Sequence, residues 1–283
     1  MMGAAGDDEI ADALRADLAL TVVDARSAGA IARIARELGR TATIHLKADT
    51  GMGRQGLPSE ALADVARAIR SHAELYFEGA YSHLARGDDD REATRRQTRR
   101  FRDFAMSLDP RPPLLHLANS GGALIEECRF DMARIGIALY GGTPLYPECV
   151  PAMSVFGRIV HARVFAPGET VSYGMTYRAE RKMRIGVVGV GYGEGYPRAL
   201  SNAGWTLTHG RRCPIVGTIC MDQFMIDLTA APHAQPGDLA LLFGRDNGST
   251  LPAWELAAAA GTISYELMTV IGRLAGPERT WVE

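Results

Sequence analysis

The chain has 283 residues, of which 47% are hydrophobic, so it is long enough to bury one large barrel or two domains. Its 31 basic and 33 acidic side chains nearly cancel, which argues against nucleic acid or an anionic membrane surface as a partner. No run of 18 apolar residues occurs, and the first ten residues do not resemble a secretion leader. We therefore expect a cytoplasmic protein that acts on small molecules.

The first half of the chain alternates short apolar runs with amphipathic helical patterns, which is typical of successive βα units around a parallel sheet. Strands are expected at 18–24, 41–48, 75–83, 114–120 and 132–141. A complete barrel of this kind has eight strands, so five predict an incomplete (β/α)8 TIM-type barrel without its first three units. We expect such a barrel to aggregate or to depend on partner chains, because its edges and interior are open.

From about residue 150 the pattern changes to alternating apolar and polar residues separated by turn signals, with one helix near residues 252–261. This pattern predicts a mostly antiparallel β domain. The sequence therefore predicts an α/β domain at residues 1–145 and a β domain at residues 146–283. The four cysteines form no C-x-x-C pair, so neither disulfide bonds nor a metal site is expected.

Eight motifs are spread along nearly the whole chain. The first is HLKADTGMGRQG at 45–56, where a lysine at a strand end precedes a glycine-rich turn and an arginine. The others follow in order at 81–85, 116–120, 133–141, 168–177, 191–198, 217–227 and 262–267. Together the motifs resemble those of the alanine racemase family. The resemblance implies an isomerase that interconverts L-alanine and D-alanine with pyridoxal 5'-phosphate and supplies D-alanine for peptidoglycan.

The resemblance implies a cofactor site at the end of the barrel. Its phosphate contacts would be Ser120, Gly136, Ile137 and, from the β domain, Tyr265. A hydroxyl and exposed backbone N–H groups suit a phosphate, and barrel enzymes commonly bind phosphate after their last strands. Arg134 would face the pyridine nitrogen. A permanent cation there disfavours protonation of that nitrogen, which weakens the cofactor as an electron sink and suits racemisation.

Racemisation needs one base on each face of a planar intermediate. The resemblance implies that Tyr173 is one base and that the cofactor lysine is the other. In the family this tyrosine reaches the site from the partner subunit, which implies a head-to-tail homodimer with two shared sites. The family carries the cofactor lysine on its first barrel strand, and neither Lys47 nor Lys182 matches it. We therefore expect this chain to be inactive alone.

The resemblance gives roles to five further residues. Arg54 matches the arginine near the substrate carboxylate, and Lys47 matches a supporting lysine that is carbamylated in many members. His83 would tune the tyrosine base by a hydrogen bond. Met221 would contact the substrate carboxylate through its backbone, and Tyr192 would line the entrance.

Two alternatives stay open. One is a non-catalytic remnant or interaction protein that has lost the lysine. The other is a racemase for another small amino acid, because Thr218 stands where some relatives have an arginine at the entrance. The arginine-rich segment at 91–108 also invites a nucleic-acid interpretation, but we favour the solvated outer helix of a barrel.

Overall fold

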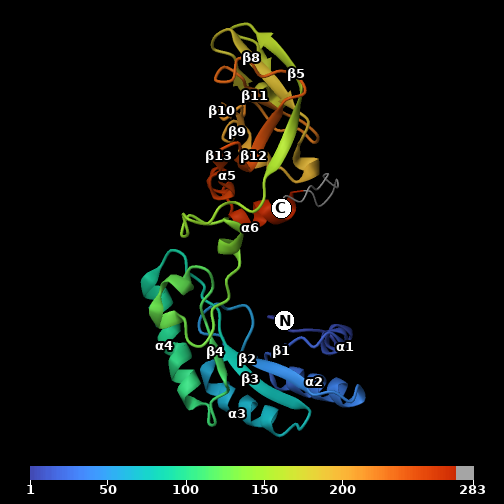
Figure 1. The fold of residues 1–283 in the computed structure, drawn as a ribbon, viewed down its shortest axis with the longest axis vertical. Helices are drawn as coiled ribbons and strands as arrows, with labels where there is room; N and C mark the ends of the chain where they lie inside the picture. Colours follow the sequence, from blue (N-terminus) through green and yellow to red (C-terminus); the bar gives the residue numbers. More distant parts are fainter. Residues whose placement is uncertain (272–283) are drawn as a thin grey trace. The chain divides into compact units, whose positions relative to one another are not determined.

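The computed structural model describes residues 1–271, which form two compact units that divide between Gly136 and Ile137. The first unit (residues 1–136) contains a parallel sheet with helices, and the second unit (residues 137–271) contains mostly antiparallel strands (Figure 1). The predicted order of an α/β domain followed by a β domain is thus confirmed. The predicted boundary at residues 145 and 146 stays a prediction.

The first unit alternates helices and strands along the chain. Its elements are α1 (Asp7–Arg15), β1 (Leu20–Val22), α2 (Ala25–Glu37), β2 (Ala42–Lys47), α3 (Ser59–Arg70), β3 (Leu75–Tyr81), α4 (Arg91–Ser107) and β4 (Leu114–His116). The strands pair in parallel in the order β1-β2-β3-β4. Parallel neighbours require a crossover between them, and the intervening helices provide it.

Helix α2 shows how the local sequence sets this packing. It begins where the Asp24 carboxylate accepts a hydrogen bond from the Ser27 N–H at 2.6 Å, which satisfies an otherwise unpaired backbone donor. Its apolar stripe includes Ile31 and Ala35, both at most 2% exposed, and the helix packs against β1, β2 and β3. Burial of this stripe fixes the helix on one face of the sheet.

The two faces of β2 differ in chemistry because successive side chains of a strand point in opposite directions. Ala42, Ile44 and Leu46 belong to the apolar core. His45 and Lys47 alternate with them, are also buried, and therefore lie on the opposite face. In a barrel that opposite face is the interior, so polar groups gather there.

The fifth expected strand at 132–141 is not formed. Met132 makes one isolated parallel bridge to His116, and the Arg134 N–H donates to the Ala118 carbonyl at 2.9 Å. The chain then enters a 3-10 helix at Ile137–Tyr140, and Gly141 turns it with φ +61°. The segment starts parallel pairing, but the turn ends it before a strand can develop.

The second unit is built on a seven-stranded antiparallel sheet in the order β10-β9-β12-β5-β8-β11, with β13 paired to β12. Its strands are β5 (Val155–Phe165), β6 (Thr170–Val171), β7 (Tyr177–Arg178), β8 (Met183–Val188), β9 (Trp205–Thr208), β10 (Arg211–Pro214), β11 (Phe224–Asp227), β12 (Leu239–Asp246) and β13 (Ser249–Leu251), followed by helices α5 (Ala253–Ala259) and α6 (Ser264–Val270). Tyr196 and Phe224 stack at 4.9 Å between ring centroids in its apolar core. Within residues 1–271, no helix is long and apolar enough to cross a membrane.

Candidate active site

Three chemically active side chains stand at the C-terminal ends of neighbouring parallel strands in the first unit. Lys47, Tyr81 and His116 are the last residues of β2, β3 and β4, and they pair with one another in register. Their strands run in parallel, so these residues meet at the same edge of the sheet, the C-terminal edge where barrel enzymes build active sites. The Tyr81 ring stacks on the His116 ring with centroids 4.8 Å apart.

Lys47 is 3% exposed, and its Nζ lies 5.0 Å from the centre of the Tyr81 ring. Burial lowers the pKa of its amine, and the positive charges of Arg54 and Arg134 lower it further, while Asp49 opposes them. An amine in such surroundings is more readily neutralised and more nucleophilic than an exposed lysine. This fits a modified or supporting lysine, as the sequence resemblance implies.

Arg134 lies at the centre of this site, and its side-chain hydrogen-bond partners among residues 1–271 are all neutral. Its Nη1 is 2.6 Å from His116 Nδ1, and its Nη2 donates to the Ser82 and Leu117 carbonyls at 2.8 and 3.2 Å. His83 Nδ1 lies 3.3 Å from the same nitrogen. Burial lowers the pKa of Arg134 to about 10, so the guanidinium still carries its full charge at neutral pH.

The two histidines beside Arg134 are held neutral. Burial, followed by the charge of Arg134, lowers the pKa of His83 to about 4. The same causes, with His45 as a third, lower the pKa of His116 to about 3. Both imidazoles therefore act as hydrogen-bond partners rather than as cations near pH 7.

Ser120 and Gly136 are brought together as the sequence predicts for a phosphate site. The Gly136 N–H donates to Ser120 Oγ at 3.2 Å, and Ser120 is 3% exposed. A side chain at Gly136 would meet no atom within 4 Å, so there is open space beside this backbone. The other two predicted phosphate residues belong to the second unit, where Ile137 is 7% exposed and Tyr265 lies on α6.

The residues of the first unit fit pyridoxal phosphate as a noncovalent ligand. Among the described residues, Arg134 Nε is buried without a hydrogen-bond partner, which is costly unless an acceptor such as a pyridine nitrogen reaches it. The Ser120–Gly136 pair has the chemistry of a phosphate contact. The two lysines fit a covalent attachment of the cofactor less well, because Lys47 lies against the Tyr81 ring and Lys182 is exposed between β7 and β8.

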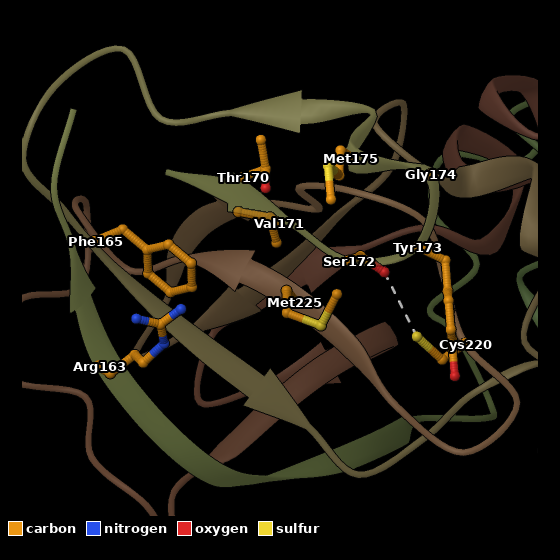
Figure 2. Close-up of a pocket in the computed structure, with 10 residues that line it drawn as sticks. All are labelled: Arg163, Phe165, Thr170, Val171, Ser172, Tyr173, Gly174, Met175, Cys220 and Met225. Atoms are coloured by element: carbon orange, nitrogen blue, oxygen red, sulfur yellow. Dashed lines mark hydrogen bonds between the residues drawn. The ribbon is translucent and has the colours of Figure 1, made fainter. Parts of the chain in front are cut away.

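In the second unit, Tyr173 lies on an exposed turn next to a cavity of about 500 Å³ (Figure 2). The turn is strained, because Ser172 and Met175 both have positive φ, at +66° and +51°. It is anchored by the buried Thr218, whose Oγ1 donates to the Tyr173 carbonyl at 2.9 Å. Thr218 thus supports the backbone of Tyr173, whose side chain stays 74% exposed.

Met221 and Tyr192 are also brought together, by backbone hydrogen bonds between their loops. The Tyr192 N–H donates to the Cys220 carbonyl at 3.1 Å, and the Gly193 N–H donates to the Met221 carbonyl at 2.7 Å. A side chain at Gly191 would lie 2.2 Å from the Met221 carbonyl oxygen, so only glycine allows this approach. Met221 and Tyr192 are 61% and 41% exposed.

Two predicted roles, those of Arg54 and His83, are not decided by this geometry. Arg54 is exposed in the loop between β2 and α3. His83 faces Arg134 in the first unit, so its predicted effect on Tyr173 stays a prediction. The structure also shows polar residues to which the sequence analysis gave no role, namely Glu78, His45 and His116. Two features of the sequence could have pointed to the histidines: His45 lies two residues before Lys47 on the same strand, and His116 ends a strand.

A parallel α/β unit with buried basic groups at its strand ends, followed by an antiparallel β unit, defines an enzyme of the barrel-plus-β-domain class. The chain matches the family described as "Alanine racemase, N-terminal domain" over residues 1–144 and "Alanine racemase, C-terminal domain" over residues 152–276. The chain therefore belongs to the alanine racemase family. It is accordingly an isomerase with the barrel-plus-β fold, and its family depends on pyridoxal phosphate.

Individual relatives agree with this assignment. The chain is 38% identical to an alanine racemase of Symbiobacterium thermophilum over 266 residues, which cover 90% of this chain and 71% of that protein. The solved alanine racemase from D-cycloserine-producing Streptomyces lavendulae superposes with a TM-score of 0.88 at 32% identity, covering 96% of this chain and 75% of that one. The biosynthetic alanine racemase of Pseudomonas aeruginosa gives 0.85 at 34% identity, with 94% and 74% covered.

Proposed function

We propose that this chain interconverts L-alanine and D-alanine by two-base proton transfer with pyridoxal phosphate as cofactor. The observation that carries the proposal is Arg134, a charged guanidinium held only by neutral acceptors, with its Nε unpaired among the described residues. When bound, the cofactor withdraws electrons from the substrate Cα and so makes its proton removable. Arg134 limits this withdrawal, because its charge opposes protonation of the neighbouring ring nitrogen.

The remaining roles follow from the chemistry of the side chains. Tyr173 would remove or return the proton on one face of the substrate Cα through its phenolic oxygen. Arg54 and the Met221 backbone would bind the substrate carboxylate, and Tyr192 would line the entrance. Ser120, Gly136, Ile137 and Tyr265 would bind the phosphate. Lys47 would support Arg54, and His83 would tune the tyrosine base.

We further propose a head-to-tail homodimer in which Tyr173 of one protomer serves the site of the other. Tyr173 and Met175 are 74% and 71% exposed on one turn, which is unusual for large side chains that have no partner to meet. The proposed physiological role is supply of D-alanine for peptidoglycan in the cytoplasm. Neither Lys47 nor Lys182 is expected to bond covalently to the cofactor, so the chain alone is proposed to be inactive.

The test combines a binding assay with an activity assay on the 283-residue chain. Pyridoxal phosphate should bind, but borohydride treatment should leave no cofactor mass on either lysine, and no D-alanine should form. A hybrid chain that adds the residues of the Streptomyces lavendulae relative unmatched here should racemise alanine. In that hybrid, Tyr173→Phe should lower kcat by about 10²- to 10⁴-fold, the contribution of a general base.

Each alternative has its own outcome. Borohydride-stable cofactor on Lys47 or Lys182, together with racemisation, would show that the chain carries its own lysine. An inactive hybrid that does not bind the cofactor would favour the non-catalytic interaction protein. A hybrid that prefers serine to alanine would favour a racemase for another small amino acid.

A further inference from the structure

A row of four polar side chains crosses the inner face of the first unit. The Glu78 carboxylate lies 2.8 Å from His45 Nε2, and His45 Nδ1 lies 2.8 Å from His116 Nε2. His116 Nδ1 in turn lies 2.6 Å from Nη1 of Arg134. These four residues form a continuous hydrogen-bond relay that ends on the guanidinium proposed to meet the cofactor.

The direction of every proton in this relay follows from its two ends. Arginine can only donate, so His116 Nδ1 must accept, and the proton of this neutral imidazole lies on Nε2. His116 Nε2 then donates to His45 Nδ1, which places the His45 proton on Nε2 as well. That proton is donated to Glu78, which when ionised can only accept. The guanidinium and the carboxylate at the two ends therefore favour the same tautomer of both rings, and Glu78 stabilises the His45 tautomer by accepting its Nε2 proton.

The backbone of β3 is shaped to place this carboxylate. Ile44 pairs with Phe77, but His45 pairs with Gly79, so Glu78 is an extra residue without a partner on β2. Such a β-bulge turns a side chain away from its regular direction and is common beside active sites. The bulge thus allows Glu78 to reach His45, whose side chain is only 11% exposed.

Gly79 provides the space for the His45 ring. A Cβ at this position would lie 2.5 Å from His45 Nδ1 and 2.6 Å from its Cε1, which no real side chain could tolerate. The ring therefore occupies the place of the missing side chain on its way to His116. On the other side of the relay, Tyr81 stacks flat on His116 with an interplanar angle of 5° and fixes that ring as well.

We propose that Glu78 is a positioning residue that holds His45 in the tautomer that accepts from His116 and, through these two rings, holds the Nε–H of Arg134 toward the pyridine nitrogen of the cofactor. Two neutral rings separate the carboxylate from the guanidinium. Arg134 is therefore oriented by an anion without being neutralised by one, which a direct carboxylate contact would not achieve. The link to the cofactor rests on the proposed function, whereas the tautomers do not.

The test reads imidazole tautomers by long-range ¹H–¹⁵N NMR of the full chain near pH 7, without cofactor. His45 and His116 should each carry their proton on Nε2 alone. Glu78→Ala should abolish the single tautomer at His45 while His116 keeps its proton on Nε2, because Arg134 still donates to His116 Nδ1. Glu78→Gln should retain the single His45 tautomer, because the amide oxygen still accepts. Glu74→Ala is the matched control, since Glu74 precedes the same strand but pairs with Arg36 on the surface, and it should change neither ring.

A proton on Nδ1 of His116 or His45 in the unaltered chain would overturn the proposal, and so would an unchanged His45 tautomer in folded Glu78→Ala. If Glu78→Ala does not fold, a His45 proton on Nδ1 in Glu78→Gln would still overturn the proposal. Added pyridoxal phosphate should shift the Arg134 Nε–H signal, and Glu78→Ala should weaken binding about fivefold to tenfold, the usual effect of one lost hydrogen bond. Correct tautomers without any cofactor-induced shift would contradict the proposed function and leave the relay standing.

Discussion

The two units place their candidate site residues differently. In the first unit, Lys47, His45 and His116 are all buried and lie in contact with one another or with other polar partners. In the second unit, Tyr196 is fully buried, yet its hydroxyl has no partner among the described residues. The proposed second-unit site residues Tyr173 and Met221 are instead exposed.

This difference separates two ways of making a site. The first unit arranges its chemical groups within its own fold, so their geometry depends on the stability of that unit. The second unit is stabilised by an apolar core and presents Tyr173 and Met221 at its surface. Perturbations should therefore affect the two units through different forces, and hydrogen exchange measured across a urea series can follow peptides of each unit separately.

The largest expected effect comes from the apolar core of the second unit. Phe224→Ala should lower its free energy of unfolding by about 3 to 5 kcal/mol, because it removes a fully buried ring and leaves a cavity. Peptides of β8 and β11 should lose protection while those of β2 and β3 do not. The matched variant Phe101→Ala, which removes an equally buried ring from the first unit, should do the reverse. Joint loss of protection in either variant would show that the two units unfold as one.

Acid should act on the first unit. The pKa of His116 is about 3 when folded, below its ordinary value of 6.5, so the unfolded state binds the proton first as pH falls. Stability is therefore complete above pH 6.5 and is lost below it, by about 2 kcal/mol at pH 5 for this ring, and His83 adds in the same direction. The second unit, whose His161, His209 and His233 are exposed, should keep its protection over the same range. Equal acid sensitivity of both units would contradict the comparison.

The smallest expected changes in stability come from removing the hydroxyl of a buried tyrosine in each unit. Tyr81 is hydrogen-bonded to Thr21 Oγ1 at 2.9 Å, so Tyr81→Phe should cost the first unit about 1 kcal/mol. Tyr196→Phe removes a hydroxyl that has no partner within residues 1–271, so it should be neutral or stabilise the second unit by up to about 1 kcal/mol. Urea midpoints of the two variants give the measurement. A loss of stability in Tyr196→Phe would mean that an ordered water satisfies the hydroxyl.

Much of the fold was predictable because it depends on periodicity. The alternating apolar runs and helical stripes identified four parallel strands and the antiparallel β unit. The segment at 132–141 misled the prediction because its apolar residues favour a strand, whereas the chain makes one bridge, enters a 3-10 helix and is turned by Gly141. Local pattern does not show where pairing ends.

The candidate site was predictable only in part. Arg134, Ser120 and Gly136 came from motifs. The structure brings Ser120 and Gly136 together, whereas the role of Arg134 toward the cofactor stays a prediction. Glu78 was missed because its role depends on a bulge, which changes the direction of a side chain without leaving a distinctive residue pattern. Contacts between strands far apart in sequence decide such roles.

The loop that carries Arg54 is closed at its base by backbone hydrogen bonds. The Asp49 N–H donates to the Leu57 carbonyl at 2.8 Å, and the Leu57 N–H donates to the Lys47 carbonyl at 3.1 Å. Inside the loop, the Asp49 carboxylate accepts from three successive backbone N–H groups, those of Gly51, Met52 and Gly53. The conformational entropy of this loop is therefore lost during folding rather than during substrate binding, so an anion that meets Arg54 orders little more than one side chain.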